Sequence, residues 1–158
     1  MAELELITHT PDATERLGRA LAGLLPAGAV VALFGDLATG KTCLVRGMAA
    51  HYADGAPVHS PTFTLVNQYG ADPALYHLDL YRLGGPEELA DLGYEELFEP
   101  DGVCVVEWAE RASLLLPPHR LEVRLFHEGG DARRLIFEDR GVLPAGWEQA
   151  LSGAAPKS

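Results

Sequence analysis

The sequence predicts one α/β domain built around a mixed sheet. Helical and strand patterns alternate in the first part of the chain, and two hairpin patterns follow, which adds antiparallel pairs to the sheet. A chain of 158 residues suits a single domain with a substantial core. No linker is long enough to divide it, so we expect one domain over residues 1–152 and a flexible tail over residues 153–158.

The first helix and the first buried strand have clear boundary signals. Thr10 suits the N-cap and Pro11 the first helical position, and leucines then follow at helical spacing until a proline. The uninterrupted apolar run 29–34 is typical of a strand buried on both faces. A second helix is expected over residues 41–52, directly after a glycine-rich stretch.

The later segments are expected to pair as hairpins. Residues 62–69 alternate in polarity, and a short loop separates them from a second strand pattern over residues 75–83. Residues 120–128 and 132–139 flank a Gly-Gly-Asp turn. Between the two hairpins, a proline and two acids that begin at Pro86 favour a helix N-terminus. The sheet should therefore be partly antiparallel.

Charge and composition narrow the classes of function. The net charge of −11 repels phosphate backbones, so strong unaided binding of nucleic acid is not expected. No apolar run reaches the roughly 18 residues that a membrane span needs, and the N-terminus lacks the pattern of a secretory signal. Cys43 and Cys104 are isolated, which favours a reducing cytoplasm over a disulfide framework or a zinc site.

A phosphate-binding pattern lies between the first buried strand and the second helix. Residues 35–42 read GDLATGKT, which fits G-x-x-x-x-G-K-[ST] at every fixed position. The glycines let the backbone wrap around phosphate, Lys41 can reach the β- and γ-phosphates, and the Thr42 hydroxyl can bind Mg²⁺. The alternative is a strand-to-helix turn with a chance lysine. The flanking patterns favour the P-loop. The chain has two lysines, and because Lys157 lies in the tail, the single lysine of the folded part is the one in this motif.

The P-loop refines the expected fold to a P-loop NTPase-like, three-layer domain. Such a site also needs an acid at the end of a buried strand. Asp79 and Glu107 are the candidates, and Glu107 ends the apolar run 103–107. Asp79 equally suits an outward position on an alternating strand, whereas a carboxylate that ends a buried strand is costly without a partner. Ser60 and Thr62 flank Pro61, which by itself indicates only a turn. Beside a P-loop, however, hydroxyls on such a loop can sense a γ-phosphate.

Two further features have ordinary structural explanations. His77 shares a strand face with Asp79, which makes a possible metal pair, but no zinc-ligand motif accompanies them. Seven acids lie between Glu87 and Asp101, where they suit a solvated helical face or, alternatively, a docking surface for a partner protein.

These elements, in this order, resemble the bacterial TsaE (YjeE) family, the ATPase of tRNA threonylcarbamoyladenosine biosynthesis. The resemblance spans about residues 35–111, through GDLATGKTCLVRGM, SPTFTLVNQY, YHLDLYRLGGPEEL and VCVVEWAER. It implies a small P-loop domain that hydrolyses ATP slowly with Mg²⁺. It also implies action through the partner proteins TsaB and TsaD. The chain would contact tRNA only through that complex, and no membrane would be involved.

The resemblance also implies roles for single residues. Lys41, Asp79, Glu107 and Thr62 would form the catalytic set, and Thr42 and Glu107 would hold Mg²⁺. Arg133 is an alternative to Arg134, because the terminal regions align poorly. The residues that would contact the nucleotide are Thr10, Gly35, Asp36, Leu37, Ala38, Thr39, Gly40, Lys41, Thr42, Cys43, Trp108 and Arg134.

The P-loop departs from the family's usual GDLGAGKTT at Ala38, Thr39 and Cys43. A backbone with positive φ at Ala38 would be strained without glycine, so we expect altered nucleotide affinity at most.

Two other functions share the P-loop: a small-molecule or nucleoside kinase, and a regulator that binds nucleotide without hydrolysing it. Phosphate release without an added acceptor separates the ATPase from the kinase.

Overall fold

The computed structural model describes residues 2–35, 40–53, 66–70, 74–79, 102–107, 109 and 116–154. Within them a seven-stranded sheet has the order β1-β7-β6-β2-β5-β4-β3. The strands are β1 Ala2–Thr8, β2 Val30–Phe34, β3 Val66–Tyr69, β4 Leu75–Asp79, β5 Val103–Glu107, β6 Leu121–His127 and β7 Arg133–Asp139. The helices are α1 Pro11–Leu24, α2 Lys41–Tyr52 and α5 Trp147–Ala154.

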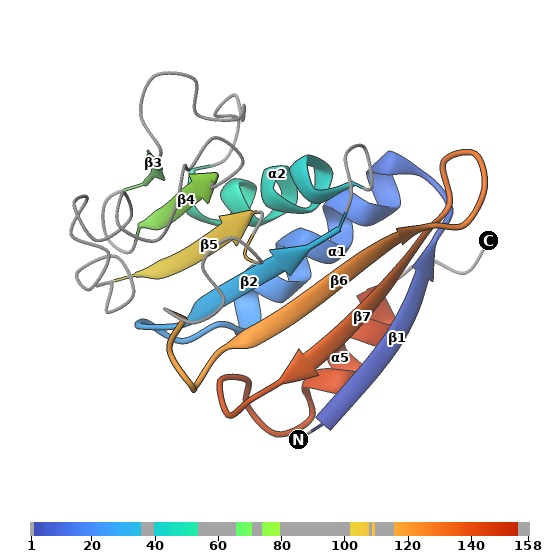
Figure 1. Ribbon diagram of the computed structural model, residues 1–158. Coiled ribbons are helices and arrows are strands. Elements are labelled where there is room, and N and C mark those ends of the chain that lie inside the picture. The colour runs from blue at the N-terminus through green and yellow to red at the C-terminus, as the bar shows by residue number, and fades with distance from the viewer. Residues whose placement is uncertain are drawn as a thin grey trace.

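The sheet is mixed, as the sequence predicted. Strand β2 is parallel to β5 and β6, and β5 is parallel to β4. The pairs β3–β4, β6–β7 and β1–β7 are antiparallel, so both predicted hairpins are confirmed. The arrowheads of β2, β4 and β5 therefore lie along one edge of the sheet (Figure 1). Polar groups that follow these strands meet at that edge.

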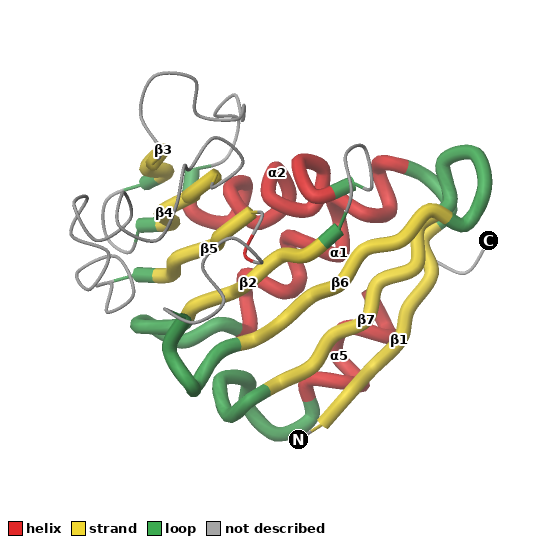
Figure 2. Tube along the Cα trace, viewed as in Figure 1, coloured by secondary structure: helices red, strands yellow, loops and turns green. Residues whose placement is uncertain are grey.

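All three described helices lie on one face of the sheet (Figure 2). Alternation along each strand directs one set of side chains toward them, such as Val31 and Leu33 of β2. The continuous core between helices and sheet contains Leu17, Leu21, Val31, Leu33, Leu44, Val45, Met48, Leu75, Val105, Leu121, Val123, Leu125, Leu135, Phe137, Trp147 and Leu151, among others. None of the described helices is long and apolar enough to span a membrane.

Helices α1 and α2 approach each other at two glycines. A Cβ atom on Gly18 would lie 2.1 Å from the backbone oxygen of Leu44, and one on Gly47 would lie 1.8 Å from that of Glu15. Both distances are far below van der Waals contact, so only glycine fits at either position. Gly18 and Gly47 therefore fix the distance between α1 and α2, and with it the position of Lys41, the first residue of α2.

Two elements are absent from the sequence prediction. Strand β1 alternates glutamate with leucine, and it pairs along its whole length with β7. Helix α5 buries Trp147 and Leu151 in the core and runs to Ala154, two residues into the expected tail. The helix expected from Pro86 and the acidic run that follows it lie outside the described residues.

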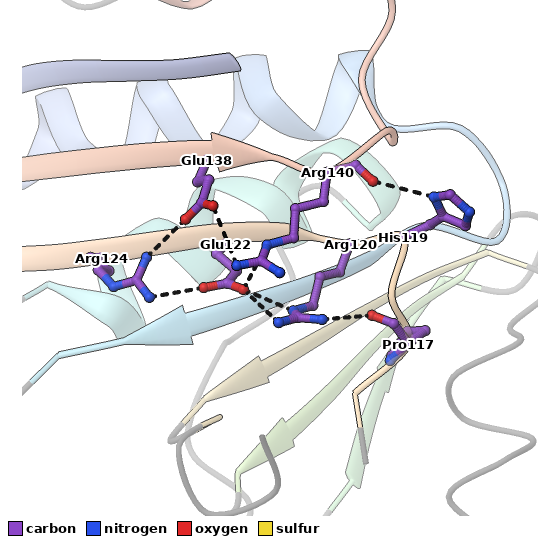
Figure 3. A network of polar contacts seen from close by, with 7 residues as sticks. All are labelled: Pro117, His119, Arg120, Glu122, Arg124, Glu138 and Arg140. Atoms are coloured by element: carbon purple, nitrogen blue, oxygen red, sulfur yellow. Dashed lines mark hydrogen bonds and ion pairs between the residues drawn. The ribbon is translucent and has the colours of Figure 1, made fainter. Parts of the chain in front are cut away.

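The face of the sheet turned away from the helices holds a charged network (Figure 3). Its centre is Glu122 on β6, whose side chain is 2% exposed. The carboxylate forms ion pairs with Arg120 at 2.7 Å, Arg124 at 3.0 Å and Arg140 at 3.1 Å. Glu138 on β7 pairs with Arg124 and Arg140, each at 3.3 Å. The three guanidinium groups therefore compensate a carboxylate that has been removed from water.

Replacing Glu122 with alanine is expected to lower the free energy of unfolding by about 2–3 kcal/mol, because three arginines lose their shared partner. Glu128→Ala is the matched control, since Glu128 is 34% exposed and pairs only with Arg134 among the described contacts. That surface pair should contribute less than about 1 kcal/mol. Urea unfolding of both variants measures the difference, and equal losses would contradict the assigned role of the network.

Candidate functional site

The P-loop lies between β2 and α2, as the flanking patterns predicted. Strand β2 ends at Phe34, and α2 begins at Lys41 and ends at Tyr52. Gly40 is the N-cap of α2 and has φ 99° and ψ 11°, a left-handed conformation that favours glycine. Residues 36–39 lie outside the described part of the chain.

The side chain of Lys41 reaches back to Gly35, the residue after β2. This side chain is buried, with 5% relative exposure, and Nζ donates a hydrogen bond to the backbone oxygen of Gly35 at 2.6 Å. The contact brings together the first and last parts of the motif, which are six residues apart in sequence. An ammonium group held at this position can meet the oxygens of a bound phosphate.

The start of α2 suits an anion. Gly40 provides no side-chain cap for the helix, and no acid lies in its first turn. The unpaired N–H groups of a first turn and the positive end of the helix dipole favour phosphate. Thr42 and Cys43 lie in this turn and are half-buried. Lys41, Gly40 and the helix start therefore fit a nucleotide phosphate group.

Both candidate acids lie at the carboxyl edge of the parallel strands. Asp79 is the last residue of β4 and Glu107 the last of β5, and the two are directly paired in register. Glu107 is also in register with Leu33, one residue before the end of β2. The parallel strands thus bring Glu107 to the edge from which the P-loop starts. The side chain of Asp79 lies outside the described part of the structure.

Glu107 has the partner that its burial requires. Its side chain is 3% exposed, and its Oε2 accepts a hydrogen bond from Nε2 of His77 at 2.5 Å. His77 is fully buried on β4. The sequence pattern groups His77 with Asp79 and does not indicate its contact with Glu107. The signal that could have connected them is a buried acid next to a strand with one histidine on the same face.

The structure distinguishes between the two adjacent arginines of β7. Arg133 lies on the helix-covered face, and its Cγ would be 3.6 Å from a Cβ atom on Gly40. Arg134 lies on the opposite face, where it pairs with Glu128 at 2.7 Å and its guanidinium lies 4.7 Å from the centre of the Phe126 ring. Arg133, and not Arg134, is the arginine placed beside the P-loop.

The N-terminus of α1 approaches the P-loop at the same place. Thr10 caps α1, as predicted, and its Oγ1 accepts a hydrogen bond from the Ala13 N–H at 3.1 Å. The hydroxyls of Thr8 and Thr14 form a buried hydrogen bond of 2.6 Å. The Cγ2 of Thr14 would be 3.8 Å from a Cβ atom on Gly40. Thr14, one helical turn after Thr10, and Arg133 therefore both lie beside Gly40.

The structure does not describe several expected site residues. Asp36, Leu37, Ala38, Thr39, Thr62 and Trp108 lie outside the described residues. Both cysteines are free, and burial raises the pKa of Cys104 to about 12, so its thiol stays neutral. In the part of the chain that the structure describes, no three His, Cys, Asp or Glu side chains gather as a metal cluster.

The chain is similar to several known proteins in sequence and in fold. The chain is 39% identical over 122 residues to the tRNA threonylcarbamoyladenosine biosynthesis protein TsaE of Treponema pallidum, covering 77% of this chain and 90% of that one. It is 38% identical over 139 residues to the Bacillus subtilis protein of the same name, covering 87% and 86%. A crystal structure of Bacillus subtilis YdiB superimposes with a TM-score of 0.71 at 29% identity, covering 97% and 94%.

The family model described as "Threonylcarbamoyl adenosine biosynthesis protein TsaE" matches residues 8–136. The matched range includes the P-loop, both strand-end acids and the adjacent arginines of β7. With the P-loop between β2 and α2 and the relatives at 38–39% identity, the chain belongs to the TsaE family.

Proposed function

We propose that this chain binds ATP with Mg²⁺, hydrolyses ATP slowly, and acts with the partner proteins TsaB and TsaD in the threonylcarbamoylation of tRNA adenosine. The tRNA part of the proposal is supported by the relatives, which are named for tRNA threonylcarbamoyladenosine biosynthesis. The nucleotide part is supported above all by the hydrogen bond from Lys41 to Gly35, which joins a buried lysine to the first glycine of the P-loop pattern.

The residues of the site would have separate tasks. Lys41 and the first-turn N–H groups of α2 would bind the phosphates. Thr42 and Glu107 would hold Mg²⁺, which when bound offsets charge on the phosphate oxygens. Asp79 would orient the attacking water or a switch segment, and Thr62 would sense the γ-phosphate. Trp108 would lie beside the nucleotide, and Asp36, Leu37, Ala38 and Thr39 would complete the loop around the phosphates.

Arg133 is our candidate for a nucleotide-contacting arginine, because it lies beside Gly40. Arg133→Ala is expected to weaken ATP binding by about tenfold, the usual effect of losing one charged hydrogen bond. Arg134→Ala is the matched control on the same strand and should change the affinity by less than about twofold. Isothermal titration of both variants makes the measurement. A loss confined to Arg134→Ala would contradict the assignment.

The proposal includes a cytoplasmic protein that meets tRNA only through its partners. Two free cysteines are consistent with a reducing compartment. The net charge of −11 disfavours tRNA binding by the isolated chain, because counterion release requires basic groups gathered on one face. In the described part of the chain, the arginines around Glu122 and Glu138 are paired with acids and offer little excess charge.

The decisive experiment is tRNA threonylcarbamoylation in vitro with purified TsaB and TsaD, with and without this chain, alongside phosphate release by the chain alone. We expect modification to depend on the chain and on ATP. Phosphate transfer that requires an added small-molecule acceptor would instead indicate a kinase. An absence of hydrolysis even with both partners, while ATP is bound, would instead indicate a regulator that binds nucleotide without turnover.

A further inference from the structure

We infer that His77 is a positioning residue: its hydrogen bond to Glu107 fixes the carboxylate through which Mg²⁺ is recognised. The inference rests on the proposed function, because it takes Glu107 as a group that meets Mg²⁺. It adds a residue that is outside the P-loop and outside the set of strand-end acids.

The strand register explains how the two side chains meet. On the parallel pair β4–β5, His77 lies opposite Val105 and Asp79 lies opposite Glu107. Val105 belongs to the core between sheet and helices, so the side chains of His77, Val105 and Glu107 are directed to the helix-covered face. The imidazole of His77 reaches one pair further along the strands and donates from Nε2 to Oε2 of Glu107. The histidine therefore approaches the acid from the core side, and the P-loop starts at the same edge.

Burial makes this contact the main determinant of where the carboxylate points. His77 has no exposed surface and the Glu107 side chain has 3%. With water excluded from the pair, a side-chain hydrogen bond of 2.5 Å holds Oε2 in place. Oε1 is not part of this contact. Carboxylates that bind metals are commonly oriented by such an outer hydrogen bond, and the loss of that bond typically lowers metal affinity by about 10–100-fold.

The other ring nitrogen of His77 argues against a purely structural role. Nδ1 is buried and has no hydrogen-bond partner among the described residues. Among the described residues on this face, Leu75 precedes His77 on β4, Asn67 lies opposite it on β3, and the Tyr69 ring centre lies 6.5 Å from that of the imidazole. An apolar side chain would pack here without leaving a buried polar atom unsatisfied. The histidine is therefore explained by the bond that Nε2 makes to Glu107.

The test compares His77→Gln with His77→Asn. Both variants keep a polar amide, but only the longer glutamine can place an N–H group where Nε2 of the histidine was. ATP binding is measured by titration calorimetry across a range of Mg²⁺ concentrations and in EDTA. We expect His77→Asn to lower the apparent Mg²⁺ affinity by about 10–100-fold with little change in EDTA, and His77→Gln to stay within about threefold of the wild type.

Two controls separate positioning from stability. Leu75→Ala lies on the same face of β4 and should lower the unfolding temperature without changing the Mg²⁺ dependence. In a Glu107→Gln background, His77→Asn should have no further effect on the Mg²⁺ dependence, because the residue acts through the carboxylate.

The outcomes distinguish this inference from the proposed function. If His77→Asn and His77→Gln show the same Mg²⁺ dependence as the wild type while Glu107→Gln loses it, the positioning role is wrong and the nucleotide site stands. If both histidine variants lose the Mg²⁺ dependence equally, the specific Nε2 bond is not the cause and the inference is also wrong. A wild-type chain that binds no ATP with or without Mg²⁺ would overturn the proposed function, and this inference with it.

Discussion

Replacing Lys41 with alanine is expected to abolish measurable ATP hydrolysis, a fall of at least about 100-fold. The ammonium group is buried at the start of α2, and Nζ lies 2.6 Å from the Gly35 oxygen. A cation at this position offsets charge on the β- and γ-phosphates, and the described part of the chain contains no other lysine. Phosphate release with Mg²⁺-ATP measures the effect, and threonylcarbamoylation with TsaB and TsaD should fail in parallel.

Lys157→Ala is the control for the loss of one positive charge, because Lys157 is the chain's other lysine and lies in the tail beyond α5. It should hydrolyse ATP at the wild-type rate. Thermal unfolding of Lys41→Ala should show a folded protein, which attributes the loss to the site and not to misfolding. Hydrolysis by Lys41→Ala at the wild-type rate would refute the P-loop assignment.

Replacing Gly18 with alanine is expected to destabilise the fold by about 3 kcal/mol, the upper part of the range for overpacking. The new Cβ atom would lie 2.1 Å from the Leu44 backbone oxygen, so α1 and α2 must move apart. The movement would separate helices that together bury Leu17, Leu21 and Met48. Urea unfolding measures the stability. Because α2 begins at Lys41, ATP affinity should fall as well.

The matched control is Gly23→Ala in the same helix. A Cβ atom there would have His51 Cε1 as its nearest neighbour at 3.8 Å, which is an ordinary contact. Removing a glycine from a helix should stabilise the protein by up to about 1 kcal/mol. The same substitution is thus expected to act in opposite directions at two positions of α1. A destabilisation of similar size in both variants would show that the close approach of the helices is not the cause.

The sequence by itself determined the features that consecutive residues build. The strand and helix that flank the glycine-lysine pattern are each built from one short segment, so the apolar run before the pattern and the helical spacing after it were sufficient to predict them. Phosphate binding by the pattern itself stays a prediction. The cap of α1 at Thr10 and the placement of Glu107 at the end of a buried strand follow for the same reason. Each depends on local backbone preferences or on the burial of one continuous run.

Only the tertiary structure decided which distant residues meet. Strand β1 pairs with β7, far away in the chain, and α5 gains its burial only by packing Trp147 and Leu151 into the shared core. Short segments of this kind have little stability of their own, so their local sequence is weak evidence for them.

The candidate site at the carboxyl edge of the parallel strands likewise contains contacts that only the tertiary structure decided. His77 and Glu107 meet through the register of β4 and β5. The choice between Arg133 and Arg134 depends on which of two adjacent side chains faces the P-loop. A shift of one residue in register exchanges the two faces of a strand, and an Arg-Arg pair gives no local indication of its register. Register is set by pairing with neighbouring strands and by core packing, and both form only when the whole sheet assembles.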